Sequence, residues 1–146
     1  MGFKVQEMSL RVELGPFEKL FIGKSVLTNH GARSMFVIDG DIPVLRARDV
    51  LSPNLAASSL ERLYYCVQQM YLEEDLEKYQ KSYLALARQT ISENSNLGSE
   101  LQVTLQLITS GQHYKALNGL KKLLKPEAFA VSKTKALATR PQLWRS

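Results

Sequence analysis

Residues that commonly build metal sites or disulfides are scarce in this sequence. It has one cysteine, Cys66, and two histidines, His30 and His113, which are far apart among the 146 residues. A single cysteine cannot form an internal disulfide, and these three residues lack the spacing of a metal site. Cys66 lies within an apolar helical run, so we expect a small buried residue rather than a reactive thiol. Neither a metal nor a cofactor is predicted.

The sequence also lacks any long hydrophobic run. Its apolar stretches span only a few residues, whereas a membrane-spanning helix requires about 20. The N-terminal residues MGFKVQEMSLRVE have no apolar segment followed by a small-residue cleavage site, so no signal peptide is expected. We therefore predict no membrane association and a cytoplasmic location, which a lone cysteine also fits.

Motifs that support catalysis are missing as well. Four early glycines, Gly15, Gly23, Gly31 and Gly40, are spaced as turns and not as the phosphate loops GxxxxGK[ST] or GxGxxG. No GxSxG motif is present, and no Ser–His–Asp or Cys–His arrangement can be argued from the residues. The acidic residues between positions 73 and 77 are typical of a solvated helix face. We therefore predict that the protein is not an enzyme.

Positive charge is concentrated near the C-terminus. The chain has 19 Lys and Arg against 14 Asp and Glu, and residues 111–146 contain eight basic residues and one acidic residue. Such a basic end favours an anionic partner, either nucleic acid or an acidic protein face. The alternative is a solvated, partly disordered tail.

The first third of the chain has the pattern of short β-strands. Apolar residues occupy every second position from Met8 to Leu14, as in a half-buried strand. Short strands separated by tight turns predict antiparallel pairing in a small sheet or a barrel-like half. The turns are expected at residues 15–16, 23–24, 29–32 and 39–41, the last with the hairpin-type pair Asp39–Gly40.

From residue 52 onward, the apolar spacing becomes that of helices. Ser58 and Glu61 match a capping box, in which the two residues satisfy each other's free backbone N–H groups. Apolar stripes then predict about four amphipathic helices, the last of which ends before Pro126. The sequence thus predicts an α+β protein with a β-rich subdomain at residues 1–51, a helical subdomain at residues 52–125 and a basic flexible tail at residues 126–146.

Four blocks of residues occur in a distinctive order along the chain. They are EKLFIGKSVL (residues 18–27), IPVLRARDVLSP (residues 42–53), RLYYCVQQMYL (residues 62–72) and the weaker GQHYKAL (residues 111–117). In order and spacing they resemble the EKxFIxxAVL, PVLRxxDILxP, RxxYFxVQxMY and GxxYxAL patterns of the flagellum biosynthesis repressor family, FlbT. The chain departs from those patterns at Thr28, where a basic residue is common in the family.

The resemblance implies a post-transcriptional regulator of flagellin expression. Members of the family associate with the 5′ untranslated region of flagellin mRNA and promote its degradation, and they usually act beside a small flagellar regulator, FlaF. The expected partners are therefore the flagellin mRNA leader and FlaF. The alternative is a protein-interaction adaptor of flagellar assembly, which binds FlaF or flagellin through its helical half.

Basic residues near turns and strand ends are the candidate RNA contacts, because Lys and Arg at phosphates supply most nucleic-acid affinity. Arg46 and Arg48 are the first choices, since residues at strand spacing point to the same side of a sheet. The segment EKLFIG, followed by PVLRARDV with both arginines, also resembles the strands of the carbon storage regulator family. Members of that family bind mRNA leaders with a strand-end arginine. Alternatively, both arginines pair with Asp39, Asp41 and Asp49 on a solvated edge. The further candidates are Lys24, Arg33, Lys121, Lys122 and Lys125.

Three tyrosines of the helical half are candidates for binding a protein partner. They are Tyr64, Tyr65 and Tyr71. Tyrosine is favoured at interfaces because it buries a large area and keeps a polar hydroxyl. The alternative is that these tyrosines belong to the core of the helical half.

Overall fold

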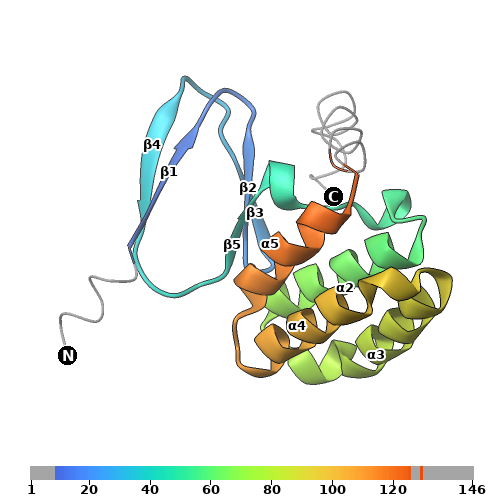
Figure 1. The fold of residues 1–146 in the computed structure, drawn as a ribbon. Coiled ribbons are helices and arrows are strands. Elements are labelled where there is room, and N and C mark those ends of the chain that lie inside the picture. The colour runs from blue at the N-terminus through green and yellow to red at the C-terminus, as the bar shows by residue number, and fades with distance from the viewer. Residues whose placement is uncertain (1–8, 126–128, 130–146) are drawn as a thin grey trace. The chain divides into compact units, whose positions relative to one another are not determined.

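The chain begins with strands and continues with helices. A computed structural model describes residues 9–125 and Phe129 (Figure 1). It divides into two compact units, residues 1–47 and residues 48–146. The first unit contains five strands and the second contains four α-helices among the described residues. The predicted α+β class is therefore confirmed.

The predicted subdomain boundaries, after residues 51 and 125, stay predictions. The predicted flexible tail, residues 126–146, lies outside the described residues except for Phe129, which is buried. Within the described part of the chain, no helix is long and apolar enough to cross a membrane. The same residues contain no group of three or more His, Cys, Asp or Glu that could hold a metal ion.

The first unit contains two small antiparallel sheets, one of two strands and one of three (Figure 1). In the smaller sheet β1 pairs with β4, and in the larger sheet β2 lies between β3 and β5. The strands are β1 (Leu10–Leu14), β2 (Lys19–Ile22), β3 (Ser25–Thr28), β4 (Ser34–Ile38) and β5 (Val44–Arg46).

The core of the first unit follows from the alternation in its strands. Val12 and Leu14 of β1 are buried together with Leu20 of β2. Phe36 and Ile38 of β4 are half-buried and pack against this cluster. The opposite face of the β1–β4 sheet is therefore the polar or exposed one, as expected when alternate side chains point to opposite faces.

Among the predicted connections between strands, the turn at Gly23 is observed, whereas the hairpin at Asp39–Gly40 is not. The turn at Gly23 joins β2 and β3, whose register pairs Ile22 with Ser25, and Gly23 has a φ of 56°. The prediction of a hairpin at Asp39–Gly40 is wrong, because β4 pairs with β1 whereas β5 pairs with β2. This stretch instead connects the two sheets.

Asn29 joins three segments of the first unit. Its buried side-chain amide nitrogen lies 2.9 Å from the carbonyl oxygens of both Leu14 and Ala32, and 3.1 Å from that of Gly15. Its side-chain oxygen accepts a hydrogen bond from the amide of Gly31 at 3.0 Å. One side chain therefore provides hydrogen bonds to the backbone where β1 ends and where the loop before β4 turns.

We expect Asn29→Ala to lower the free energy of unfolding by about 2 kcal/mol, because buried polar groups that lose their partner cost about 1–3 kcal/mol. Denaturant titration gives the loss, and hydrogen exchange of the amides in β1 and β4 locates it. Ser25→Ala, at an exposed position of β3, is the control. Equal losses in the two variants would contradict the role of Asn29.

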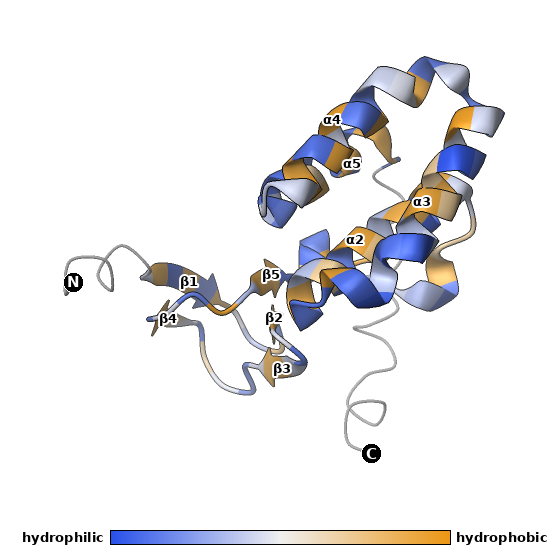
Figure 2. Cartoon of the chain, turned by 90° about the horizontal axis from the view of Figure 1, so that it is seen from below, coloured by the Kyte–Doolittle hydropathy of each residue, from blue (hydrophilic) through white to orange (hydrophobic). Residues whose placement is uncertain are grey.

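The second unit is built on four helices along which hydrophobic and hydrophilic residues alternate (Figure 2). α2 packs against α3 and α5, and α4 packs against α5. The helices are α2 (Ser59–Glu73), α3 (Leu76–Glu93), α4 (Gly98–Thr109) and α5 (His113–Leu123). Short 3-10 turns lie before α2 and before α4: η1 (Ala47–Asp49) and η2 (Pro53–Leu55) precede α2, and η3 (Ser95–Leu97) precedes α4.

Side-chain caps fix where the first two helices begin. The hydroxyl of Ser58 accepts from the amide of Glu61 at 3.0 Å, and the carboxylate of Glu61 accepts from the amide of Ser58 at 3.0 Å. The predicted capping box is thereby confirmed. Asp75 caps α3 by accepting from the amide of Lys78 at 3.1 Å.

Cys66 of α2 is buried, as predicted. Its thiol donates to the carbonyl oxygen of Tyr79 at 3.6 Å. Burial disfavours the charged form and raises the pKa of the Cys66 thiol to about 11.

Because the thiolate is the nucleophile, this raised pKa predicts slow alkylation. A change of the pKa from 9.0 to about 11 lowers the thiolate fraction about 100-fold near pH 8. We expect iodoacetamide to label the folded chain at least about 100-fold more slowly than the urea-unfolded chain, with mass spectrometry as the readout. Similar rates in the two states would refute the burial of this thiol.

Candidate nucleic-acid interface

Two side chains of α2 hold residues 48–53, which we call the connecting segment. The hydroxyl of Tyr64 donates to the carbonyl oxygen of Asp49 at 2.5 Å. The side chain of Gln68 accepts from the amide of Leu51 at 2.8 Å and donates to the carbonyl oxygen of Leu51 at 3.2 Å. Because Tyr64 and Gln68 are four residues apart, they lie on one face of the helix and reach neighbouring parts of the segment.

Burial makes these contacts costly to lose. Gln68 is 2% exposed and Tyr64 is 1% exposed. Burial, together with the nearby carboxylate of Asp49, raises the pKa of Tyr64. The hydroxyl of Tyr64 therefore remains a hydrogen-bond donor at neutral pH.

Lys121 of α5 holds the connecting segment from a second helix. Its ammonium group forms an ion pair with the carboxylate of Asp49 and donates to the carbonyl oxygen of Arg48 at 3.2 Å. The same ammonium lies 5.1 Å from the ring centroid of Phe129, and this ring meets that of Tyr64 edge-on at 5.1 Å. The positive charge of Lys121 is thus already balanced inside the unit.

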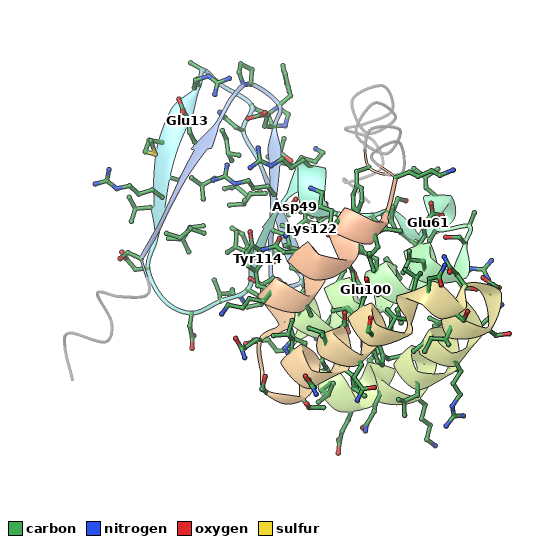
Figure 3. The ribbon with its side chains drawn as sticks, in the orientation of Figure 1. Glu13, Asp49, Glu61, Glu100, Tyr114 and Lys122 are labelled. Carbon is green, nitrogen blue, oxygen red and sulfur yellow. The ribbon has the colours of Figure 1, made fainter. Side chains whose placement is uncertain are left out.

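Three cations in this region remain exposed. Arg48 follows the first residue of η1, Lys122 lies in the last turn of α5, and Lys125 follows that helix. None of the three takes part in an ion pair among the described residues. We call Arg48, Lys122 and Lys125 the basic cluster. The Asp49–Lys121 pair brings its two parts together, and Figure 3 labels Asp49 and Lys122 there.

The expectation that Arg46 and Arg48 share one face of a sheet is wrong. Arg46 is the last residue of β5, whereas Arg48 lies in η1, where the backbone has left the strand. The two residues also belong to different compact units. The alternative, in which both pair with nearby aspartates, is not observed among the described residues, where Asp49 pairs with Lys121.

The remaining cationic candidates, Lys24 and Arg33, lie in the first unit. Lys24 is exposed in the turn between β2 and β3. Arg33 precedes β4, and its guanidinium lies 3.8 Å from the carboxylate of Glu13, with both side chains more than half exposed. Such an exposed pair contributes at most about 1 kcal/mol, so it leaves Arg33 accessible to an anion.

The tyrosines differ in exposure. The alternative expectation for the three candidate tyrosines was burial in the core of the helical half. Tyr64 is such a core residue, whereas Tyr65 and Tyr71 are half-buried. The ring of Tyr71 lies 6.1 Å from that of Tyr114 on α5. Tyr114 is 47% exposed and its position is labelled in Figure 3.

Sequence reasoning missed two residues of this region. Gln68 lies on the apolar face of α2, four residues after Tyr64, and a polar residue at such a position was the available signal. Tyr114 lies in the block GQHYKAL and was not among the tyrosines chosen as candidates. The buried positions of α5 are Ala116, Leu117 and Leu120, which places Tyr114 at the border of the buried face of that helix.

The described residues thus define a small α+β protein whose candidate site is a cluster of exposed cations. The chain belongs to the FlbT family of flagellar proteins, since a family model described as flagellar protein FlbT matches residues 10–131. The resemblance inferred from the four sequence blocks is confirmed.

Curated relatives agree with this assignment. The chain is 43% identical to the probable flagellum biosynthesis repressor protein FlbT of Rhodopseudomonas palustris (strain TIE-1), over 86% of this chain and 100% of that protein. It is 34% identical to the probable flagellum biosynthesis repressor protein FlbT 1 of Bradyrhizobium diazoefficiens, over 80% of this chain and 81% of that protein. It is 25% identical to the flagellum biosynthesis repressor protein FlbT of Caulobacter vibrioides (strain ATCC 19089 / CIP 103742 / CB 15), over 82% of this chain and 87% of that protein. No solved structure matches the chain.

We expect Gln68→Met, which keeps the size of the side chain, to free the connecting segment. The substitution leaves the amide and carbonyl of Leu51 unpaired, so the free energy of unfolding should fall by about 2–3 kcal/mol. Hydrogen exchange at the amide of Leu51 should accelerate strongly. Gln102→Met, at an exposed position of α4, is the matched control. Unchanged exchange at Leu51 in the Gln68 variant would disprove the clamp.

Proposed function

We propose that the protein is a post-transcriptional regulator of flagellin expression that binds the 5′ untranslated region of flagellin mRNA and promotes its degradation. Membership of the FlbT family supports the regulatory role, because relatives are named flagellum biosynthesis repressors. The observation that carries RNA binding is the basic cluster, in which Arg48, Lys122 and Lys125 are exposed and lack ion pairs among the described residues.

The cluster suits a flexible anionic strand. Arg48 offers a planar guanidinium that contacts two phosphate oxygens at once, whereas the lysines act as point charges. The backbone at Arg48 is fixed by Lys121, so little conformational entropy is lost there when a phosphate binds. The anchored backbone thus gives the Arg48 side chain a fixed starting point from which to meet a phosphate.

The exposed face of α5 extends the surface. Lys115, Asn118 and Lys122 are exposed, with the spacing that places side chains along one face of the helix, and Lys125 is exposed just after the helix ends. Tyr114, the second residue of this helix, lies about 12 Å along the helix axis from Lys122, at 1.5 Å per residue. An aromatic ring beside cations is the arrangement on which single-stranded bases stack while their phosphates are neutralised.

The triple variant Arg48→Ala, Lys122→Ala and Lys125→Ala tests the site. In a gel-shift assay with a flagellin leader RNA, we expect binding to weaken at least about tenfold and the salt slope to decrease by about 2, because single strands contribute about 0.7 for each phosphate contact. The control Arg62→Ala, Lys81→Ala and Arg88→Ala removes three exposed cations from α2 and α3, so it has the same net charge.

Two outcomes would argue against this proposal. A purified wild-type chain that does not bind the leader would refute direct RNA contact. If the cluster variant and the control bind equally, contact would have to rest on the other predicted residues, Arg46, Lys24 and Arg33, of the first unit.

The alternative function, an adaptor of flagellar assembly, has its own support. Tyr65 and Tyr71 are half-buried and Tyr114 is exposed, so these aromatic side chains retain surface for a protein partner. Co-purification with FlaF or flagellin after nuclease treatment, in a chain that does not bind the leader alone, would favour the adaptor over the RNA-binding protein.

A further inference from the structure

In the part of the chain that the structure describes, the smaller sheet of the first unit has an open edge at β4. Among the described residues, β4 pairs with β1 along one side only. The other side of β4 therefore presents backbone N–H and C=O groups that no described strand satisfies. A two-stranded sheet is marginally stable by itself, and an open edge is a template for a further strand.

The residues of β4 do nothing to block such pairing. Its sequence is SMFVI, which contains no charged residue and no proline, the two common means of protecting an edge. Met35 is 59% exposed and Val37 is 57% exposed. Both lie on the outer face of the sheet, opposite Glu13 and Arg11 of β1. The strand thus combines an open edge with exposed apolar side chains.

We propose that β4 pairs antiparallel with β4 of a second copy of this chain, with Phe36 at the centre of the pairing. In that register Met35 faces Val37 of the second copy, and Ser34 faces Ile38 of the second copy. The two β1–β4 sheets then become one sheet of four strands, ordered β1–β4–β4–β1. The contact is isologous, as is typical of two-fold dimers.

Charge at the ends of β4 argues for a second copy as the occupant. Arg33 precedes the strand and Asp39 follows it. In the register centred on Phe36, each Arg33 faces Asp39 of the other copy, so opposite charges meet at both ends of the apolar pairs. A shift of two residues in one direction places Met35 opposite Asp39, and a shift in the other direction places Arg33 opposite Val37. Only the register centred on Phe36 pairs Met35 with Val37 and also places Arg33 opposite Asp39.

Both charged residues are available for this contact. The contact of Arg33 with Glu13, at 3.8 Å, is long and exposed to solvent. Asp39 accepts from the hydroxyl of Ser9 through one carboxylate oxygen at 2.6 Å, and the second oxygen has no partner among the hydrogen bonds of the described residues. Dimerisation therefore requires no internal bond of the unit to be broken, apart from this weak surface pair.

Analytical ultracentrifugation of the whole chain tests the proposal. We expect a wild-type dimer whose population rises with concentration. Val37→Lys should raise the dissociation constant at least about tenfold, since two symmetry-related apolar pairs are lost. Val103→Lys is the matched control, because Val103 is 53% exposed on α4 of the other unit. It should leave the dimer unchanged.

A charge exchange tests the register. Arg33→Asp places like charges opposite each other and should weaken the dimer, and Arg33→Asp combined with Asp39→Arg should restore it. Hydrogen exchange of the β1 and β4 amides checks that each variant is folded. A wild-type chain that is monomeric at its highest soluble concentration, or a Val37→Lys dimer as strong as wild type, would overturn the proposal. A double variant as weak as Arg33→Asp would overturn the register. None of these readouts depends on RNA binding.

Discussion

The two hydrogen bonds between the side chain of Gln68 and the backbone of Leu51 are the constraint on which the second unit depends. Leu51 is fully buried, yet it belongs to neither a strand nor a helix. A buried backbone amide and carbonyl need partners, and outside regular structure only side chains or water provide them. Gln68 supplies both at once. Leu51 is therefore held in place by side-chain hydrogen bonds although it belongs to no strand.

Tyr64 and Lys121 extend this constraint to the charged residues. Tyr64 fixes the carbonyl of Asp49, and Lys121 binds the carboxylate of Asp49 and the carbonyl of Arg48. Two of the sequence blocks, IPVLRARDVLSP and RLYYCVQQMYL, therefore meet in space, because Tyr64 and Gln68 of the second block bind Asp49 and Leu51 of the first. The basic cluster is a product of that meeting, because it combines Arg48 from one side of the contact with lysines of α5 from the other.

Features that depend on local chemistry could be predicted from the sequence. The capping box at Ser58 and the burial of Cys66 each follow from a few neighbouring residues. Strand pairing could not be predicted in the same way, since β1 pairs with a strand 24 residues further on and the register is set by shared burial. The pair Asp39–Gly40 has the composition of a hairpin turn, but its flanking strands have other partners.

The candidate site was predictable as residues but not as an arrangement. Arg48, Lys122 and Lys125 could each be chosen as a cation near a turn or a helix end. Their association depends on Asp49 and Lys121, which are 72 residues apart. Nothing in the sequence indicated that Lys121 is already paired, because its partner, Asp49, can be recognised only from the packed helices.

The clamp at Gln68 has a consequence for genetics. Because the buried side chains of Tyr64 and Gln68 hold Asp49 and Leu51, close to Arg48, substitutions that inactivate the proposed site should map to the interior of α2 as well as to the basic cluster. The set of positions at which substitutions inactivate the protein would therefore be larger than the set of residues that contact a bound molecule. Substitutions of buried residues in α2 should produce temperature-sensitive alleles, because they destabilise the fold. Substitutions in the basic cluster should be equally defective at every growth temperature.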